Sequence, residues 1–150
     1  MKDKKIVIKG TIIDGFNKEP IKEGVIVIEE KTITAIGKEG KVKIPEGAEV
    51  FQGKTIMPGM IDCHMHFCLN GEADFNQLII QSSLSTYAIK AVNYARRTIE
   101  SGFTTVREVG SPAHIGISLR DAVKKEIIPG PRILTSGQPL SITGGHGTFL

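Results

Sequence analysis

Strand-like and helix-like segments alternate through the last two thirds of the chain, after the turn Met57-Pro58-Gly59. Strands are predicted where β-branched and aromatic residues cluster between turn residues, over residues 60–67, 103–109 and 132–136. Helices are predicted where apolar residues recur at three- and four-residue spacing, over residues 76–101 and 117–127. Gly102 follows the first helix at a position that suits a left-handed C-cap. Strands that alternate with helices form parallel sheets with right-handed crossovers, so this part of the chain is predicted to be α/β.

The first 56 residues have a different pattern, with short strand-like runs separated by tight turns. Two runs, residues 25–28 and 32–37, flank a turn and carry apolar residues on both faces, so we expect a hairpin that is covered on both sides. Another strand is expected over residues 48–52, and no stretch is long and periodic enough for a helix. We therefore divide the chain into a small β-domain over residues 1–56 and an α/β part over residues 57–150.

The composition of the chain excludes several other classes of protein. Its 150 residues include 19 Lys and Arg and 16 Asp and Glu, for a net charge of +3, and 40% are hydrophobic. A disordered chain would have fewer apolar residues, and a nucleic-acid-binding protein needs a concentrated basic face that no Lys/Arg block here supplies. No apolar run approaches the roughly 20 residues of a membrane helix, and two cysteines are too few for a disulfide scaffold. With no secretion signal visible, we expect a cytoplasmic protein whose partner is a small molecule and neither nucleic acid nor membrane.

His64 and His66 form the strongest chemical pattern in the sequence. Residues two apart on a strand point to the same face with Cα atoms about 6.6 Å apart, so both rings can reach one metal ion at roughly 2.0–2.1 Å. Asp62 is expected on the same face. The opposite face is expected to pack against a helix through Cys63, Met65 and Phe67.

The histidine pair alone is incomplete, because a catalytic zinc ion takes three protein ligands and keeps one position open. Cys68 is a candidate third ligand, although its spacing from the histidines matches no zinc-finger template. The alternative is that the two histidines are partly exposed side chains at a strand end and bind no metal. His114 is expected to be a solvated loop residue.

Three segments match the pattern of a known enzyme superfamily. MPGMIDCHMH (residues 57–66) resembles the signature PGxIDxHxH of the amidohydrolase superfamily, and SGFTTVREVG (residues 101–110) resembles the second barrel strand of its members. PGPRILTSGQPLSITGGHG (residues 129–147) resembles the third strand and its loop in the imidazolonepropionase-like and Xaa-Pro or Xaa-Arg dipeptidase-like branch. The resemblance implies the N-terminal part of a TIM-like (β/α)8 hydrolase barrel, with its first three β/α units over residues 57–150, preceded by a small β-sandwich domain.

The resemblance also implies a reaction and its cofactor. One or two divalent cations, usually zinc, activate a water that attacks a C–N bond of an amide or peptide, such as a dipeptide. His64 and His66 match two metal ligands of this family, and His146 matches a histidine near the polar end of the substrate. Arg107 is a weaker candidate for substrate binding, since it could equally be an ion-pair partner of Glu108 or another carboxylate.

A complete barrel of this type takes about 250 residues, and only three of its eight strands are predicted here. We therefore expect the general-base aspartate and the remaining ligands beyond residue 150 or on a second chain, and the 150 residues alone to be inactive. The complete enzyme is expected to be a homo-oligomer. The alternatives are a cyclic-amide hydrolase, an aminohydrolase, a non-catalytic assembly protein with the same fold, or a self-sufficient α/β binding module.

Overall fold

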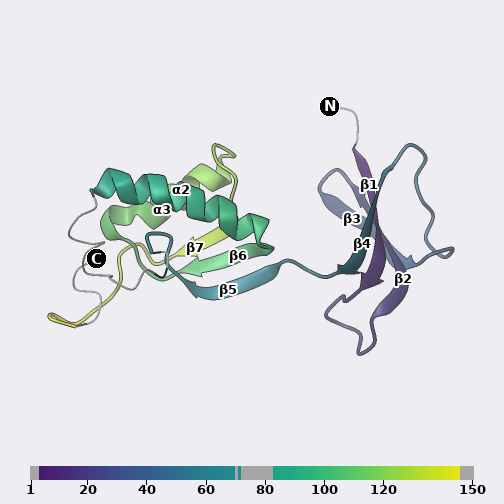
Figure 1. Cartoon of the computed structure of the whole chain (residues 1–150), viewed down its shortest axis with the longest axis horizontal. Coiled ribbons are helices and arrows are strands. Elements are labelled where there is room, and N and C mark those ends of the chain that lie inside the picture. The colour runs from purple at the N-terminus through teal and green to yellow at the C-terminus, as the bar shows by residue number, and fades with distance from the viewer. Residues whose placement is uncertain (1–3, 70, 72–82, 146–150) are drawn as a thin grey trace. The chain divides into compact units, whose positions relative to one another are not determined.

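The chain divides into two units, Met1–Pro58 and Gly59–Leu150, at the Pro-Gly turn that separates the two sequence patterns. The structure is a computed structural model that describes residues 4–69, 71 and 83–145 (Figure 1). Each unit has its own sheet, and the strands of one sheet pair only among themselves. The two units are therefore described separately.

The first unit is a four-stranded sheet in the order β3-β2-β1-β4. Its strands are β1 (Lys5–Ile12), β2 (Ile21–Glu29), β3 (Thr32–Lys38) and β4 (Glu49–Ile56). β1 pairs antiparallel with β2 and parallel with β4, and β2 forms the expected hairpin with β3. The alternating side chains of Val7, Val25 and Val27 form the core of this unit.

The expectation that the hairpin is covered on both sides is confirmed for β2 and wrong for β3. Val25, Ile26 and Val27 are all buried, so both faces of β2 are covered. On β3, Ile33 and Ile36 are 60% and 46% exposed. β3 is the outermost strand of the sheet and has only one neighbour, which explains the difference.

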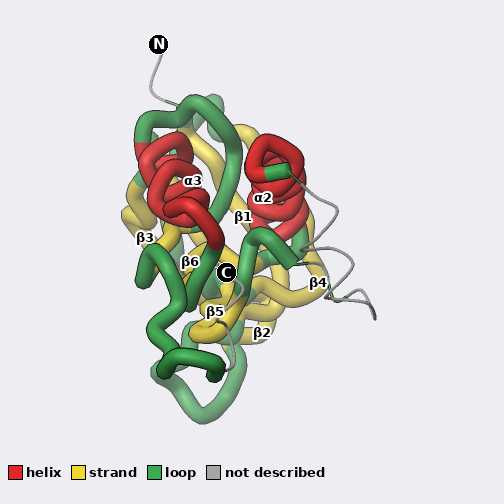
Figure 2. Tube along the Cα trace, turned by 90° about the vertical axis from the view of Figure 1, so that its left-hand side faces the viewer, coloured by secondary structure: helices red, strands yellow, loops and turns green. Residues whose placement is uncertain are grey.

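The second unit is a three-stranded parallel sheet with helices on one face, as the alternation of elements predicts (Figures 1 and 2). The strands lie in the order β5-β6-β7, with β5 at Met60–Met65, β6 at Phe103–Glu108 and β7 at Arg132–Thr135. The helices are α2 (Leu84–Glu100) and α3 (Ile115–Lys124), and a 3₁₀ turn, Pro112–His114, leads into α3. The open face of this sheet is the one that α2 and α3 leave uncovered.

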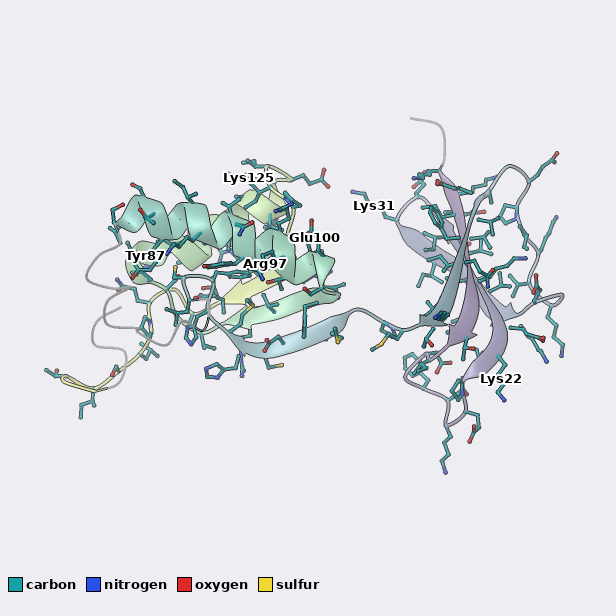
Figure 3. All side chains as sticks on the ribbon, viewed as in Figure 1. Lys22, Lys31, Tyr87, Arg97, Glu100 and Lys125 are labelled. Carbon is teal, nitrogen blue, oxygen red and sulfur yellow. The ribbon has the colours of Figure 1, made fainter. Side chains whose placement is uncertain are left out.

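Helix α2 packs on the sheet through a narrow stripe of three buried residues, Tyr87, Ala91 and Ala95. The Ser83 side chain accepts a hydrogen bond from the Thr86 N–H and so caps the first turn. Leu84 and Val92, two apolar residues beside this stripe, are 55% and 39% exposed. Figure 3 shows Arg97 and Glu100 on the last turns of α2. Among the described residues no helix is both long and apolar enough to span a membrane.

The end of α2 and the core beneath it agree with the sequence. Gly102 has φ 91°, and its N–H donates to the Ile99 carbonyl, as a left-handed C-cap requires. The main core lies between the sheet and the two helices, and its buried members are Phe67, Cys68, Tyr87, Ala91, Ala95, Val106, Ile115, Leu119 and Ile133. Among the residues that the structure describes, Phe67 is the largest of the fully buried side chains.

Phe67→Ala is expected to lower the free energy of unfolding by about 3–5 kcal/mol, because it removes a ring with no exposed surface and leaves a cavity. Phe16 is 96% exposed, so the same substitution there is expected to change stability little. Chemical denaturation of both variants beside the parent protein measures the difference. Equal stabilities for the two variants would show that Phe67 is not a core residue.

Candidate metal centre

His64 and His66 lie at the carboxyl end of β5, where the chain leaves the sheet. His64 is within the strand and exposed, and His66 follows its last residue and is half-buried. Their ring centroids are 5.5 Å apart and the ring planes meet at 74°. Two imidazoles that share one ion at about 2.0–2.1 Å with tetrahedral angles have centroids about 5 Å apart. The observed separation therefore suits two ligands of one ion.

The peptide between Cys63 and His64 lies where the regular pairing of β5 with β6 is interrupted. Pairing of β5 with β6 shifts register between Asp62 and Met65. The His64 N–H donates to Asp62 Oδ1 at 2.9 Å, and the Cys63 carbonyl accepts from Arg107 Nε at 2.7 Å. Two side chains thus satisfy both polar groups of this peptide, which sets the backbone that carries His64.

The register shift overturns the predicted faces of two residues beside the histidines. Asp62 pairs with Val106, a core residue under the helices, and it lines a pocket on the helix side of β5. Asp62 therefore does not share a face with His64. Cys63, expected against a helix, is exposed. Met65 and Phe67 do pack into the core beneath the helices, as predicted.

His66 is held by a hydrogen bond that decides which of its nitrogens is protonated. Its Nδ1 lies 2.9 Å from the Gly110 carbonyl oxygen, in the loop after β6. A carbonyl oxygen only accepts hydrogen bonds, so Nδ1 is the donor, and in the neutral ring Nε2 is the nitrogen with the free lone pair. Metal-binding histidines have this second hydrogen bond almost without exception. The chemistry of the donor pair therefore fits a zinc ion or a similar divalent cation.

No third ligand joins the pair within the part of the chain that the structure describes, where no cluster of three His, Cys, Asp or Glu residues suits a metal. Cys68 is 1% exposed and packs in the main core. Burial, followed by the negative charge of Glu108, raises the pKa of the Cys68 thiol to about 12. A metal ligand must be a thiolate, so the structure argues against Cys68 as the third ligand.

The other residues considered in the sequence, Arg107, His146 and His114, differ in their exposure and contacts. Arg107 is exposed on the open face of the sheet, and its contact is with the Cys63 carbonyl rather than with Glu108. The role of Arg107 in substrate binding stays a prediction. His146 lies outside the described residues. His114 is exposed, as expected, and has φ 59° at the start of α3.

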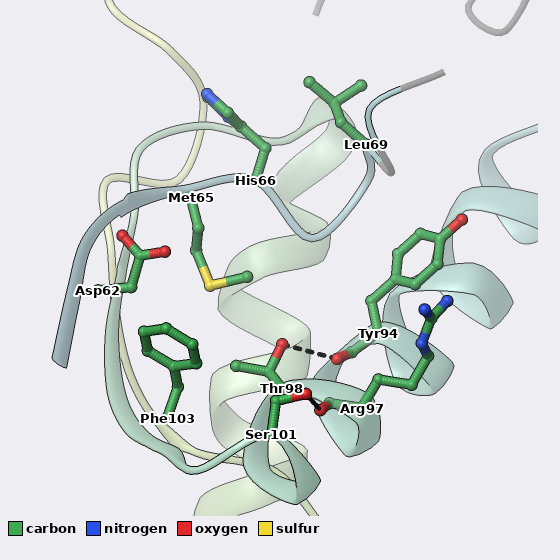
Figure 4. A pocket seen from close by; sticks show the side chains of 9 residues that line it. All are labelled: Asp62, Met65, His66, Leu69, Tyr94, Arg97, Thr98, Ser101 and Phe103. Carbon is green, nitrogen blue, oxygen red and sulfur yellow. Dashed lines mark hydrogen bonds between the residues drawn. The ribbon is translucent and has the colours of Figure 1, made fainter. Parts of the chain in front are cut away.

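A pocket of about 420 Å³ lies between β5 and α2, on the helix side of the strand (Figure 4). Its lining residues are Asp62, Met65, His66, Leu69, Tyr94, Arg97, Thr98, Ser101 and Phe103. The hydroxyls of Thr98 and Ser101 donate to backbone carbonyls of α2 at 2.8 Å. These two hydroxyls are therefore engaged by the helix itself, and Asp62, His66, Tyr94 and Arg97 supply the other polar groups of the lining.

Sequence reasoning missed a buried carboxylate beside the histidine pair. Glu108, the last residue of β6, has no exposed surface. Gly110 N–H and the Thr135 hydroxyl both donate to its carboxylate, at 3.2 and 2.5 Å. The signal was present, because Glu108 is two residues from Val106 and so shares its face of the strand.

The chain belongs to the amidohydrolase family, since residues 55–148 match the family model described as Amidohydrolase family. It is 31% identical over 149 residues to Ochratoxinase of Aspergillus niger, and the alignment covers 95% of this chain and 30% of that protein. It is 30% identical over 113 residues to Enamidase of Eubacterium barkeri, covering 72% of this chain and 26% of the relative. The crystal structure of a Xaa-Pro dipeptidase with methionine bound in its active site matches with a TM-score of 0.84 and 34% identity, over 95% of this chain and 36% of that one.

These comparisons confirm the resemblance to amidohydrolases and the α/β fold. The chain spans between 26% and 36% of the length of these relatives.

The two cysteines are expected to differ sharply in reactivity. In the folded protein iodoacetamide should alkylate the exposed Cys63 and leave Cys68 unmodified, because Cys68 is buried and roughly one thiol in ten thousand is ionised at pH 8. Peptide mass spectrometry of native and denatured samples measures both sites. Rapid native labelling of Cys68 would show that it is accessible and restore it as a candidate ligand.

Proposed function

We propose that this chain supplies two metal ligands of a zinc-dependent hydrolase that cleaves a C–N bond, amide or peptide, in a small molecule such as a dipeptide. One observation carries the proposal: His64 and His66 are adjacent at the carboxyl end of a parallel strand, and the Gly110 carbonyl accepts from Nδ1 of His66, which leaves Nε2 as the metal-binding nitrogen. Membership of the amidohydrolase family and the likeness to a Xaa-Pro dipeptidase support this class of reaction.

We further propose that β5, β6 and β7 are the first three strands of an eightfold barrel, and that the first unit is part of a small β-domain. Active sites of such barrels lie at the carboxyl ends of the strands, where the histidine pair lies. Ile61 and Leu134, on the open face of the sheet, are 65% and 54% exposed. Bulky branched residues of this kind fill barrel interiors, which supports the open face as the interior side.

The residues of this chain have defined tasks in such a site. When bound, a divalent cation supplies Lewis-acid chemistry, polarising a carbonyl group and acidifying a water. His64 and His66 would hold it as neutral donors, and the Gly110 carbonyl keeps the proton of His66 on Nδ1. Arg107, exposed on the open face, and His146 are the proposed contacts for the polar end of the substrate.

The general base and the remaining ligands are proposed to come from outside the described residues. Within these, no further histidine, cysteine or carboxylate completes a group of three with the pair. We propose that the rest of the same enzyme or a second chain provides them, and that the complete protein is a homo-oligomer.

His64→Ala and His66→Ala are each expected to remove most of the bound metal from the complete protein. The loss of affinity should exceed the roughly 10–100-fold that changes outside the ligand set produce. Metal analysis of the purified variants measures it, with circular dichroism to confirm that they are folded. His114→Asn is the matched control, since Asn tolerates the left-handed backbone of this exposed histidine. Full metal content in both alanine variants would disprove the metal site.

Substrate class is tested by incubating the metal-loaded protein with Xaa-Pro and other dipeptides, a cyclic amide and an amino-substituted heterocycle. We expect release of free amino acids from a dipeptide, and its loss in His64→Ala, because a metal held by the histidine pair would polarise the carbonyl of the scissile bond and acidify the attacking water. Ammonia release from the heterocycle alone would indicate an aminohydrolase. No turnover of any compound by fully loaded protein would favour a non-catalytic assembly protein.

A further inference from the structure

We propose that Glu108 is a positioning residue for the metal ligand His66, acting through the backbone of Gly110. This inference rests on the proposed function, because it assigns Glu108 a role toward the same metal site. Glu108 is fully buried, yet no lysine or arginine forms an ion pair with it in the described part of the chain. In place of an ion pair, the carboxylate accepts hydrogen bonds from the Gly110 N–H and the Thr135 hydroxyl.

The carboxylate itself is fixed from three sides. Oε2 accepts from the Thr135 hydroxyl at 2.5 Å, at the end of β7. Oε1 accepts from the Gly110 N–H at 3.2 Å, in the loop after β6. On the helix side α3 approaches so closely that a Cβ on Gly116 would lie 2.5 Å from Oε2. Glu108 therefore has one arrangement available, which joins the ends of β6 and β7.

Gly110 needs such fixing because its backbone is unusually free. Its φ is 143°, a region that residues with a side chain rarely adopt, and a Cβ there would lie 2.8 Å from Pro139. The peptide before Gly110 is held by Glu108 through the N–H. The peptide after it is held by the Ser111 N–H, which donates to the Gly137 carbonyl at 3.0 Å. With both peptides held, the Gly110 carbonyl has a fixed direction.

The hydrogen bonds around Gly110 form a closed ring, and His66 is attached to this ring through the Gly110 carbonyl. The Gly137 N–H donates to Thr135 Oγ1 at 3.0 Å, and the same hydroxyl donates to Glu108. Glu108 accepts from Gly110, whose carbonyl accepts from His66 Nδ1. Removing the carboxylate breaks this ring at two points and frees the first peptide of Gly110. The His66 ring would then lose both its fixed orientation and its fixed tautomer.

The test compares Glu108→Ala, Glu108→Gln and the control Val106→Ala in the complete protein. Val106 is two residues earlier on the same buried face, so its truncation perturbs the same core without touching the ring of hydrogen bonds. Zinc affinity is measured by competition with a chromophoric chelator at a temperature where every variant is folded. Glu108→Ala should lower zinc affinity roughly 10–100-fold. Glu108→Gln, whose amide oxygen can still accept from Gly110, and Val106→Ala should stay close to the parent protein.

A second readout needs no metal and no activity. Long-range ¹H–¹⁵N spectra of the histidine rings in metal-free protein should show His66 with its proton on Nδ1 in the parent and in Glu108→Gln. In Glu108→Ala the His66 signals should move to the averaged values of a free imidazole. The proposal is overturned if Glu108→Ala keeps the parent tautomer and zinc affinity, or loses affinity no more than Val106→Ala. It is also overturned if Glu108→Gln loses as much as Glu108→Ala, since charge and not positioning would then decide.

The outcomes separate this inference from the proposed function. Parent protein that binds no zinc would disprove the proposed metal site, while the histidine spectra would still decide whether Glu108 fixes His66. Parent protein that binds zinc, with Glu108→Ala binding it equally well, would disprove the positioning role alone.

Discussion

The hydrogen bond between His66 Nδ1 and the Gly110 carbonyl joins the ends of two neighbouring parallel strands. It exists because parallel strands bring their carboxyl ends to the same edge of a sheet, so the residues that follow β5 meet the loop that follows β6. The orientation of the His66 ring is therefore a property of the sheet. A site built in this way is as rigid as the strand pairing beneath it, which is what a metal ligand requires.

β6 supports both histidines, through consecutive residues that point to opposite faces. Arg107, on the open face, donates to the carbonyl of the peptide that carries His64. Glu108, on the helix face, holds Gly110, which holds His66. Alternation along a strand makes this division possible, because neighbours in the sequence reach different layers of the structure. The sequence suggested an ion pair between Arg107 and Glu108, and the same alternation explains why none forms.

Periodicity predicted the elements well because it depends on local sequence. The helix expected over residues 117–127 is observed at Ile115–Lys124, and each strand of the second unit lies within its expected range. The histidine pair was also visible, since two residues separated by one on a strand are neighbours in any sheet. The predicted faces of Asp62 and Cys63 were wrong because the register shift depends on pairing with β6, which β5 alone does not encode. The burial of Cys68 could not be predicted from the strand alone, because the chain turns into the core directly after β5.

The buried carboxylate of Glu108 is hard to predict from composition or from a motif. Glu108 occupies a strand position whose periodicity calls for an apolar residue, and its carboxylate would be costly there without hydrogen-bond donors. The Gly110 N–H and the Thr135 hydroxyl supply these donors, and Gly116, which has no side chain, leaves the space that the carboxylate occupies. An apolar residue at position 108 would leave the Gly110 N–H without its partner and the ring of hydrogen bonds open. The carboxylate is thus explained by what it holds in place, and the group at the end of that chain of contacts is His66.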